Sequence, residues 1–243
     1  MILIYDKTFE GFLSLVYKVY YEKLIPSKIE TKYPNTLLLE EIEVIITQES
    51  NTIKVFDAIK KSFPKKCFEM ILNIFMCDSK NFEMALLKYI ILGFKNKNEL
   101  FNINNEEVFF LQNLEKELFR QVHKMCGFTR FKELEDGSLY ARIETKFNVL
   151  YFLGKHFFKR LNNQKYIIHD INRKIAFIKN DTYLGIQNIA SFEEPKLSTS
   201  EEKFDKLWQT FFESTAIESR ENKRCQQNLV PLLYRTYMNE FKR

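Results

Sequence analysis

The sequence predicts a mixed α+β fold with a helical N-terminal part, a small antiparallel sheet in the middle and a helical C-terminal segment. Apolar residues recur at helical spacing over much of the first 125 residues, alternate across 127–190, and return to helical spacing after a polar linker at 191–200. The chain has 243 residues, of which 45% are hydrophobic, and this is enough to bury a core. We expect three parts, 1–125, 126–191 and 192–243, which together form one compact unit.

The N-terminal part begins with a short apolar run, Met1–Tyr5, which predicts a strand. An amphipathic helix is expected over 8–24, and two prolines then indicate a loop over 25–36. The run over 37–47 is rich in Leu, Ile and Val and predicts a second strand. A period of 3.6 residues predicts four further helices, over 52–63, 65–77, 80–94 and 105–125.

The middle part has a β-β-α-β-β pattern. Asp136-Gly137 lies between two alternating runs, which is a strong hairpin signal. A helix is expected over 148–161, and the segment 165–189 predicts two or three more strands. This pattern favours an antiparallel sheet with a helix on one face. In the C-terminal segment, Ser198 and Glu201 have the spacing of a capping box and predict the start of a helix.

Positive charge is concentrated in the middle of the chain. Residues 116–180 hold 14 lysines and arginines against 6 carboxylates, a net charge of +8, whereas the whole chain carries +5. A local excess of cations is the footprint expected of a protein that binds a polyanion. The alternative is a solvated surface, and charge alone does not distinguish the two.

The segment 128–132 alternates aromatic residues with basic or polar ones. On a strand, Arg130 and Lys132 share one face and Phe131 takes the other. Cations on such a face bind phosphates and exposed aromatic rings stack on bases; alternatively, the phenylalanines fill the core and the cations are only solvated. The predicted phosphate contacts are Arg130, Lys132, Arg142, Lys155, Lys159 and Arg160, with a second zone of Arg220, Arg224 and Gln227.

Catalytic chemistry has few candidates. The sequence contains no GxxxxGK[ST], GxGxxG, GxSxG or HExxH motif. His169 beside Asp170 is a weak candidate for a general base and its orienting carboxylate, and His123 is another. Adjacent residues on a strand point to opposite faces, however, so His169 and Asp170 are not expected to pair.

Metal, membrane and export signals are not expected either. The four cysteines lack CxxC spacing, so neither a metal nor a cofactor is predicted. The N-terminus does not match a signal peptide and no apolar run is long enough to span a membrane. We therefore expect a cytoplasmic protein with reduced thiols and no membrane partner.

Several strings of the sequence resemble a bacterial family of unknown biochemical function that is labelled a probable DNA metabolism protein. They are YDKTFEGFL, GFTRFKELEDGSLYARIETKFNVL, HFFKRL, YIIHD and LWQTFFESTAIESRENKRCQQNLVP, and the resemblance extends over essentially the whole chain. The chain departs from the family pattern at Thr129, where the family usually has an apolar or basic residue, and at Arg235, where the family more often has an aromatic residue. The resemblance implies a gene neighbour that encodes a radical-SAM protein labelled as putative DNA modification or repair, and some relatives are fused to a uracil-DNA-glycosylase-like domain.

The sequence and the resemblance together predict a non-catalytic component that binds DNA, or delivers it to the radical-SAM protein, in a bacterial DNA modification or repair system. Two alternatives stay open. One is an enzyme that acts on DNA bases or phosphodiesters through His169 and Asp170 or through His123. The other is a pure interaction partner of the radical-SAM protein.

Overall fold

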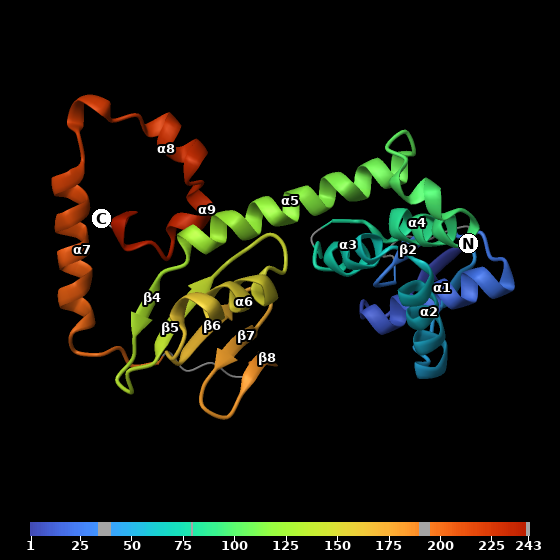
Figure 1. The fold of residues 1–243 in the computed structure, drawn as a ribbon, viewed down its shortest axis with the longest axis horizontal. Coiled ribbons are helices and arrows are strands. Elements are labelled where there is room, and N and C mark those ends of the chain that lie inside the picture. The colour runs from blue at the N-terminus through green and yellow to red at the C-terminus, as the bar shows by residue number, and fades with distance from the viewer. Residues whose placement is uncertain (34–39, 79, 190–194, 242–243) are drawn as a thin grey trace. The chain divides into compact units, whose positions relative to one another are not determined.

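The computed structural model describes residues 1–33, 40–78, 80–189 and 195–241 (Figure 1). Its internal contacts group the chain into two compact units, Met1–Leu118 and Phe119–Arg243. The boundary falls inside a helix instead of at its end. The mixed α+β class is confirmed, with helices at both ends of the chain and a five-stranded sheet between them.

The first unit contains a three-stranded parallel sheet in the order β2-β1-β3. The central strand β1, Ile2–Ile4, is fully buried and pairs with β2, Lys28–Glu30, and β3, Ile42–Val44. The strand expected over 37–47 is therefore present as β3, although 37–39 lie outside the described residues. The loop expected over 25–36 was wrong at its centre, because Ile29 of β2 is buried beside β1.

Helices form the rest of the first unit. Helix α1, Phe9–Glu22, begins where the Thr8 hydroxyl accepts a hydrogen bond from the Gly11 amide at 2.9 Å. The ring of Phe75 packs between Phe9 and Phe82, at centroid distances of 5.2 and 5.5 Å. The four predicted helices are confirmed with ends shifted by a few residues, as α2, Glu49–Ser62; α3, Lys65–Phe75; α4, Glu83–Lys95; and α5, Glu106–Phe128. A 3₁₀ helix, Lys97–Phe101, follows α4.

The second unit is built on a five-stranded sheet in the order β4-β5-β6-β7-β8. The predicted hairpin is confirmed: the Asp136 carboxylate accepts from the Ser138 amide at 2.9 Å, and Gly137 has a φ of 75°. Only the β5–β6 pair is parallel, because a helix carries the chain back between these two strands. The strands are β4, Phe131–Glu133; β5, Leu139–Ile143; β6, Tyr166–Asp170; β7, Ile175–Lys179; and β8, Leu184–Asn188.

Helix α6, Leu150–Leu161, connects β5 to β6 and covers one face of this sheet. Gly154 allows the close approach, because a Cβ atom there would lie 2.2 Å from the ring of Phe177. The Tyr166 hydroxyl donates to the Gly154 carbonyl at 2.8 Å, and the rings of Phe131 and Phe157 meet edge to face at 4.8 Å. By strand alternation, Lys132, Tyr140 and His169 belong to the opposite face of the sheet.

The C-terminal segment runs along the outer edge of β4, where the Ser198 amide donates to the Glu133 carbonyl at 2.9 Å. The capping box predicted at Ser198 and Glu201 was wrong: the Glu201 carboxylate accepts from the backbone amide of Glu133 at 2.9 Å, and Ser200 occupies the cap position without a side-chain capping bond. None of the described helices combines the length and apolar character needed to cross a membrane. The helices of this segment are α7, Glu201–Thr215; α8, Lys223–Leu229; and α9, Leu232–Arg235, with 3₁₀ turns at Glu218–Arg220 and Asn239–Phe241.

Candidate nucleic-acid interface

Three of the predicted cations meet on the sheet face opposite α6. Lys132 lies directly across from Tyr140 in the β4–β5 pair. Arg130, Lys132 and Arg142 line one small cavity of about 150 Å³, together with Tyr140, Pro195, Leu197 and Tyr237. We refer to Arg130, Lys132 and Arg142 as the paired-cation face.

Carboxylates of the C-terminal segment form ion pairs with two of these cations, Arg130 and Lys132. The Arg130 guanidinium contacts the Glu240 carboxylate at 2.6 Å, and the Lys132 ammonium contacts the Asp205 carboxylate at 2.8 Å. The guanidinium of Arg142 lies 5.7 Å from the centre of the Tyr140 ring. Burial alone would raise the pKa of Glu240, but the hydrogen bond from Arg130 lowers it below its ordinary value. These pairs fasten α7 and the last turn of the chain to the sheet.

His169 lies beneath this face and is only 3% exposed. Its Nδ1 atom is 2.9 Å from the hydroxyl oxygen of Tyr140. Burial lowers the pKa of His169, and the nearby charge of Arg142 lowers it further. The imidazole is therefore neutral at physiological pH and makes a buried polar contact in the wall of the sheet.

By strand alternation Asp170 points to the other face of the sheet, and it is fully buried. One of its carboxylate oxygens contacts the Arg173 guanidinium at 2.9 Å, and the other accepts from the Arg173 amide at 3.2 Å. The same guanidinium donates to the carbonyls of Thr145 and Lys146 at 3.1 and 2.9 Å. Asp170 thus fixes the segment between β5 and α6, and it does not orient His169.

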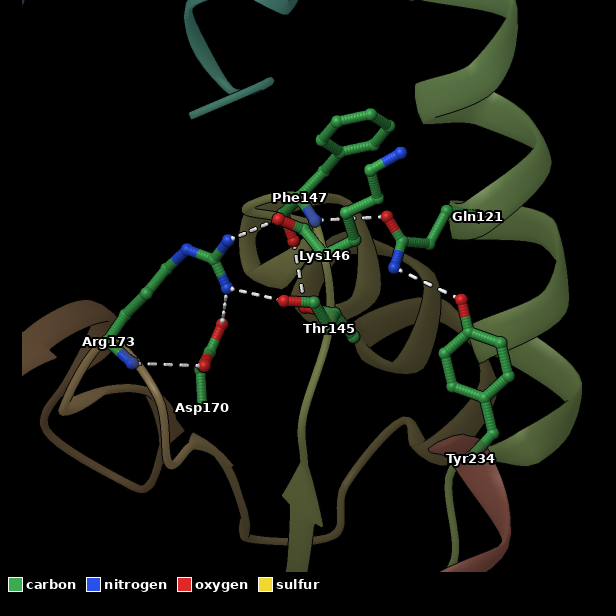
Figure 2. Close-up of polar contacts among 7 residues, drawn as sticks. All are labelled: Gln121, Thr145, Lys146, Phe147, Asp170, Arg173 and Tyr234. Carbon is green, nitrogen blue, oxygen red and sulfur yellow. Dashed lines mark hydrogen bonds and ion pairs between the residues drawn. The ribbon is translucent and has the colours of Figure 1, made fainter. Parts of the chain in front are cut away.

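The same segment is also tied to α5 and α9 (Figure 2). The Phe147 amide donates to the side-chain oxygen of Gln121 at 3.0 Å, and the Gln121 side-chain nitrogen donates to the Tyr234 hydroxyl at 3.2 Å. Gln121 is 6% exposed, so both groups of its amide find partners away from water. Sequence reasoning missed Gln121 and Arg173; the three-residue spacing from Asp170 to Arg173 across a turn was the one available signal.

The outer surface of α6 differs from the paired-cation face, because it combines exposed cations with exposed aromatic rings. Helical spacing places Tyr151, Lys155, Phe158 and Lys159 on the side of the helix away from the buried Leu150 and Leu153. Tyr151 is 50% exposed and Phe158 is 45% exposed. The Lys155 ammonium lies 5.6 Å from the Tyr151 ring centre, and that of Lys179 lies 5.7 Å from the Phe158 ring centre. We call this surface, together with Arg160, the α6 outer face; Arg160 lies on the helical side of Leu153 but is exposed because it is in the last turn of the helix.

The cations of the α6 outer face differ from those across the sheet in their partners. Within the described part of the chain, no ion pair joins Lys155, Lys159 or Arg160 to a carboxylate. Their positive charges are therefore available to an anion from outside the molecule. Sequence reasoning named these three cations but missed the exposure of Tyr151 and Phe158.

The remaining candidates are spread over the second unit. Arg220 and Gln227 line a cavity of about 1050 Å³ in the C-terminal segment, and Arg224 is exposed outside its lining. His123 is exposed on α5, and His156 is half-buried on α6 against Phe157. Within the described ranges, no contact joins the three histidines and no group of His, Cys, Asp and Glu could hold a metal ion.

Comparison with known proteins places the chain in a family. The model of a domain of unknown function, DUF4130, matches residues 80–240, and the chain belongs to this family. No curated protein and no solved structure matches it. The matched range includes all five strands of the second unit, together with the paired-cation face and the α6 outer face.

Proposed function

We propose that this protein binds DNA through the α6 outer face and has no chemistry of its own. The observation that carries this proposal is the grouping of three cations without carboxylate partners and two exposed aromatic rings on one helix. A phosphate that binds Lys155 or Lys159 displaces only counterions and water. Tyr151 and Phe158 add ring faces on which the bases of a single strand stack.

The paired-cation face is less suited to this role. A phosphate that binds Arg130 there competes with Glu240, whose carboxylate already lies 2.6 Å from the guanidinium. Because Glu240 is only 5% exposed, its release would leave a buried carboxylate without its cation. The contacts of His169 with Tyr140 and of Asp170 with Arg173 likewise support structural roles for the two strongest catalytic candidates.

The sequence resemblance adds a context to this proposal. It implies a radical-SAM protein as partner, and the chain would then deliver DNA to that enzyme in a bacterial DNA modification or repair system. In this arrangement the α6 outer face contacts the DNA and the partner supplies the reaction.

The test is a salt series of fluorescence anisotropy titrations with labelled single-stranded and double-stranded oligonucleotides. The variant K155A/K159A/R160A should bind more weakly, and the slope of log affinity against log salt should fall by about two to three, because each phosphate contact contributes about 0.9. The variant Y151A/F158A should weaken single-stranded binding more than double-stranded binding.

A matched control removes three exposed cations from the first unit, as K60A/K61A/K66A. It lowers the net charge of the chain by the same amount, so a general loss of attraction would affect both triple variants equally. Equal slopes for K155A/K159A/R160A and K60A/K61A/K66A would reject the α6 outer face as the DNA-binding surface.

A further inference from the structure

The C-terminal segment lines a cavity, open to solvent, that the proposed DNA surface does not use. Its volume is about 1050 Å³, close to the upper end of the range for small-molecule sites. Helices α7, α8 and α9 and the last 3₁₀ turn contribute its walls. Aromatic and aliphatic groups alternate there with long polar side chains, among them Phe212, Ile217, Arg220, Gln227, Arg235 and Phe241.

Arg235 is held in the wall of this cavity by two contacts. Its Nε atom donates to the Val230 carbonyl at 2.9 Å, and its guanidinium carbon lies 4.3 Å from the centre of the Phe241 ring. Its Nη2 atom is buried and has no hydrogen-bond partner among the described residues. The Nε hydrogen bond and the ring contact fix the plane of the guanidinium of Arg235, a residue that lines the cavity.

The other lining groups narrow the class of ligand. Arg220 is exposed and forms no ion pair within the described ranges, so it offers a second guanidinium to the same anion. The Gln227 amide carries both a donor and an acceptor, as the edge of a nucleobase requires. The apolar walls at Phe212 and Ile217 suit a flat, weakly hydrated ring.

We infer that this cavity binds one nucleotide, with its phosphate on Arg235 and Arg220 and its base between the apolar walls and Gln227. Guanidinium groups bind phosphate oxygens bidentately, and the stacking of Arg235 on Phe241 fixes the plane of one of them. The nucleotide is either free or the end of a DNA strand, since both present the same phosphate and base. The inference does not depend on the α6 outer face, which lies on a different helix.

Isothermal titration calorimetry of the full chain with the four 2′-deoxynucleoside 5′-monophosphates tests this inference. At least one of them should bind, and the matching nucleoside without phosphate should bind at least about tenfold more weakly. R235M keeps the length of the side chain but removes its donors, and it should weaken nucleotide binding at least about tenfold. R120M is the matched control, because Arg120 is exposed on α5 outside the cavity lining.

Two further measurements keep the outcome clear. Thermal unfolding of R235M shows whether the variant is folded, and Q227A provides a second, milder change in the same cavity that should also weaken nucleotide binding. No binding of any nucleotide to the wild-type chain, or equal binding by R235M and the wild type, would overturn the inference. Inorganic phosphate that binds as tightly as the nucleotides would overturn it as well, because the base would then contribute nothing.

A separate experiment distinguishes the end of a DNA strand from a free nucleotide as the ligand. A preference for oligonucleotides with a 5′-phosphate over those with a 5′-hydroxyl, lost in R235M, identifies a DNA end as the ligand. Binding of mononucleotides without such a preference identifies a free nucleotide. K155A/K159A/R160A should bind mononucleotides like the wild type, so failure of the DNA surface and failure of this cavity give different results.

Discussion

The paired-cation face of the sheet and the outer face of α6, the helix on the other side of the sheet, both carry lysine and arginine beside aromatic rings. They differ in whether carboxylates contact these cations. On the paired-cation face, Arg130 and Lys132 contact Glu240 and Asp205 from the C-terminal segment. On the α6 outer face, Lys155 and Lys159 have no such partners among the described residues. The comparison teaches that a run of positive charge does not define a binding surface until the positions of the carboxylates are known.

The physical consequences of the two arrangements are opposite. An arginine or lysine that contacts a carboxylate in a partly buried site contributes to folding and adds little to the outer field. An exposed cation without a partner contributes little to folding and attracts a polyanion over about a Debye length. Substitutions on the two sides should therefore separate stability from DNA binding.

The largest expected effect is a loss of stability on removal of the carboxylate that contacts Arg173. Asp170 is fully buried and contacts Arg173 at 2.9 Å, so D170A leaves a guanidinium in a protected site without its carboxylate. We expect the free energy of unfolding to fall by about 3–5 kcal/mol. Urea denaturation followed by circular dichroism measures this change.

The control for D170A is D181A, which removes the carboxylate from an ion pair on the surface. The side chains of Lys165 and Asp181 are 51% and 74% exposed, so water replaces the lost contact. The urea midpoint of D181A should match that of the wild type. If D170A and D181A change stability equally, burial does not determine how much an ion pair of this sheet contributes to the free energy of unfolding.

The next effect is smaller because its site is only partly buried. R130A removes the cation that contacts Glu240, a side chain that is 5% exposed. We expect a loss of about 2 kcal/mol, the usual value for a hydrogen bond to a charged group. The salt slope of DNA binding should stay at the wild-type value. A lower salt slope in R130A would indicate that the paired-cation face binds DNA.

Acid titration provides an independent check on the same pair. Since the pKa of Glu240 is lowered in the folded protein, its contribution is fully present above the pKa of an unfolded glutamate and is lost as the pH falls through the lowered value. Stability of the wild type should therefore decrease more steeply at acid pH than that of R130A. Identical acid profiles would show that Arg130 does not cause the shift.

The sequence predicted most of the fold because its local signals agreed with the final packing. The Asp136-Gly137 turn and the 3.6-residue period of the N-terminal helices are local features that need no distant partner. Strand β2 was missed because its three residues include a single buried position, Ile29, which is too short a pattern to detect. The capping box failed because Glu201 found a distant amide at the edge of β4.

The site was less predictable, since its partners lie far apart in the chain. Glu240 is 110 positions from Arg130, and Asp205 is 73 positions from Lys132. No local pattern indicates such pairs. The exposure of Phe158 was missed for a different reason: an aromatic residue beside the buried Phe157 matches a core pattern until the helix is oriented on the sheet.

The smallest expected effect completes the comparison. The substitutions in K155A/K159A/R160A remove side chains that extend into water, and alanine is a good helix former, so each should change the free energy of unfolding by less than about 0.5 kcal/mol. Urea denaturation of this variant beside R130A measures the difference. A large loss of stability in the triple variant would mean that its cations serve the fold, and a weaker DNA affinity would then report unfolding. Wild-type stability with a lower salt slope would assign these charges to the ligand.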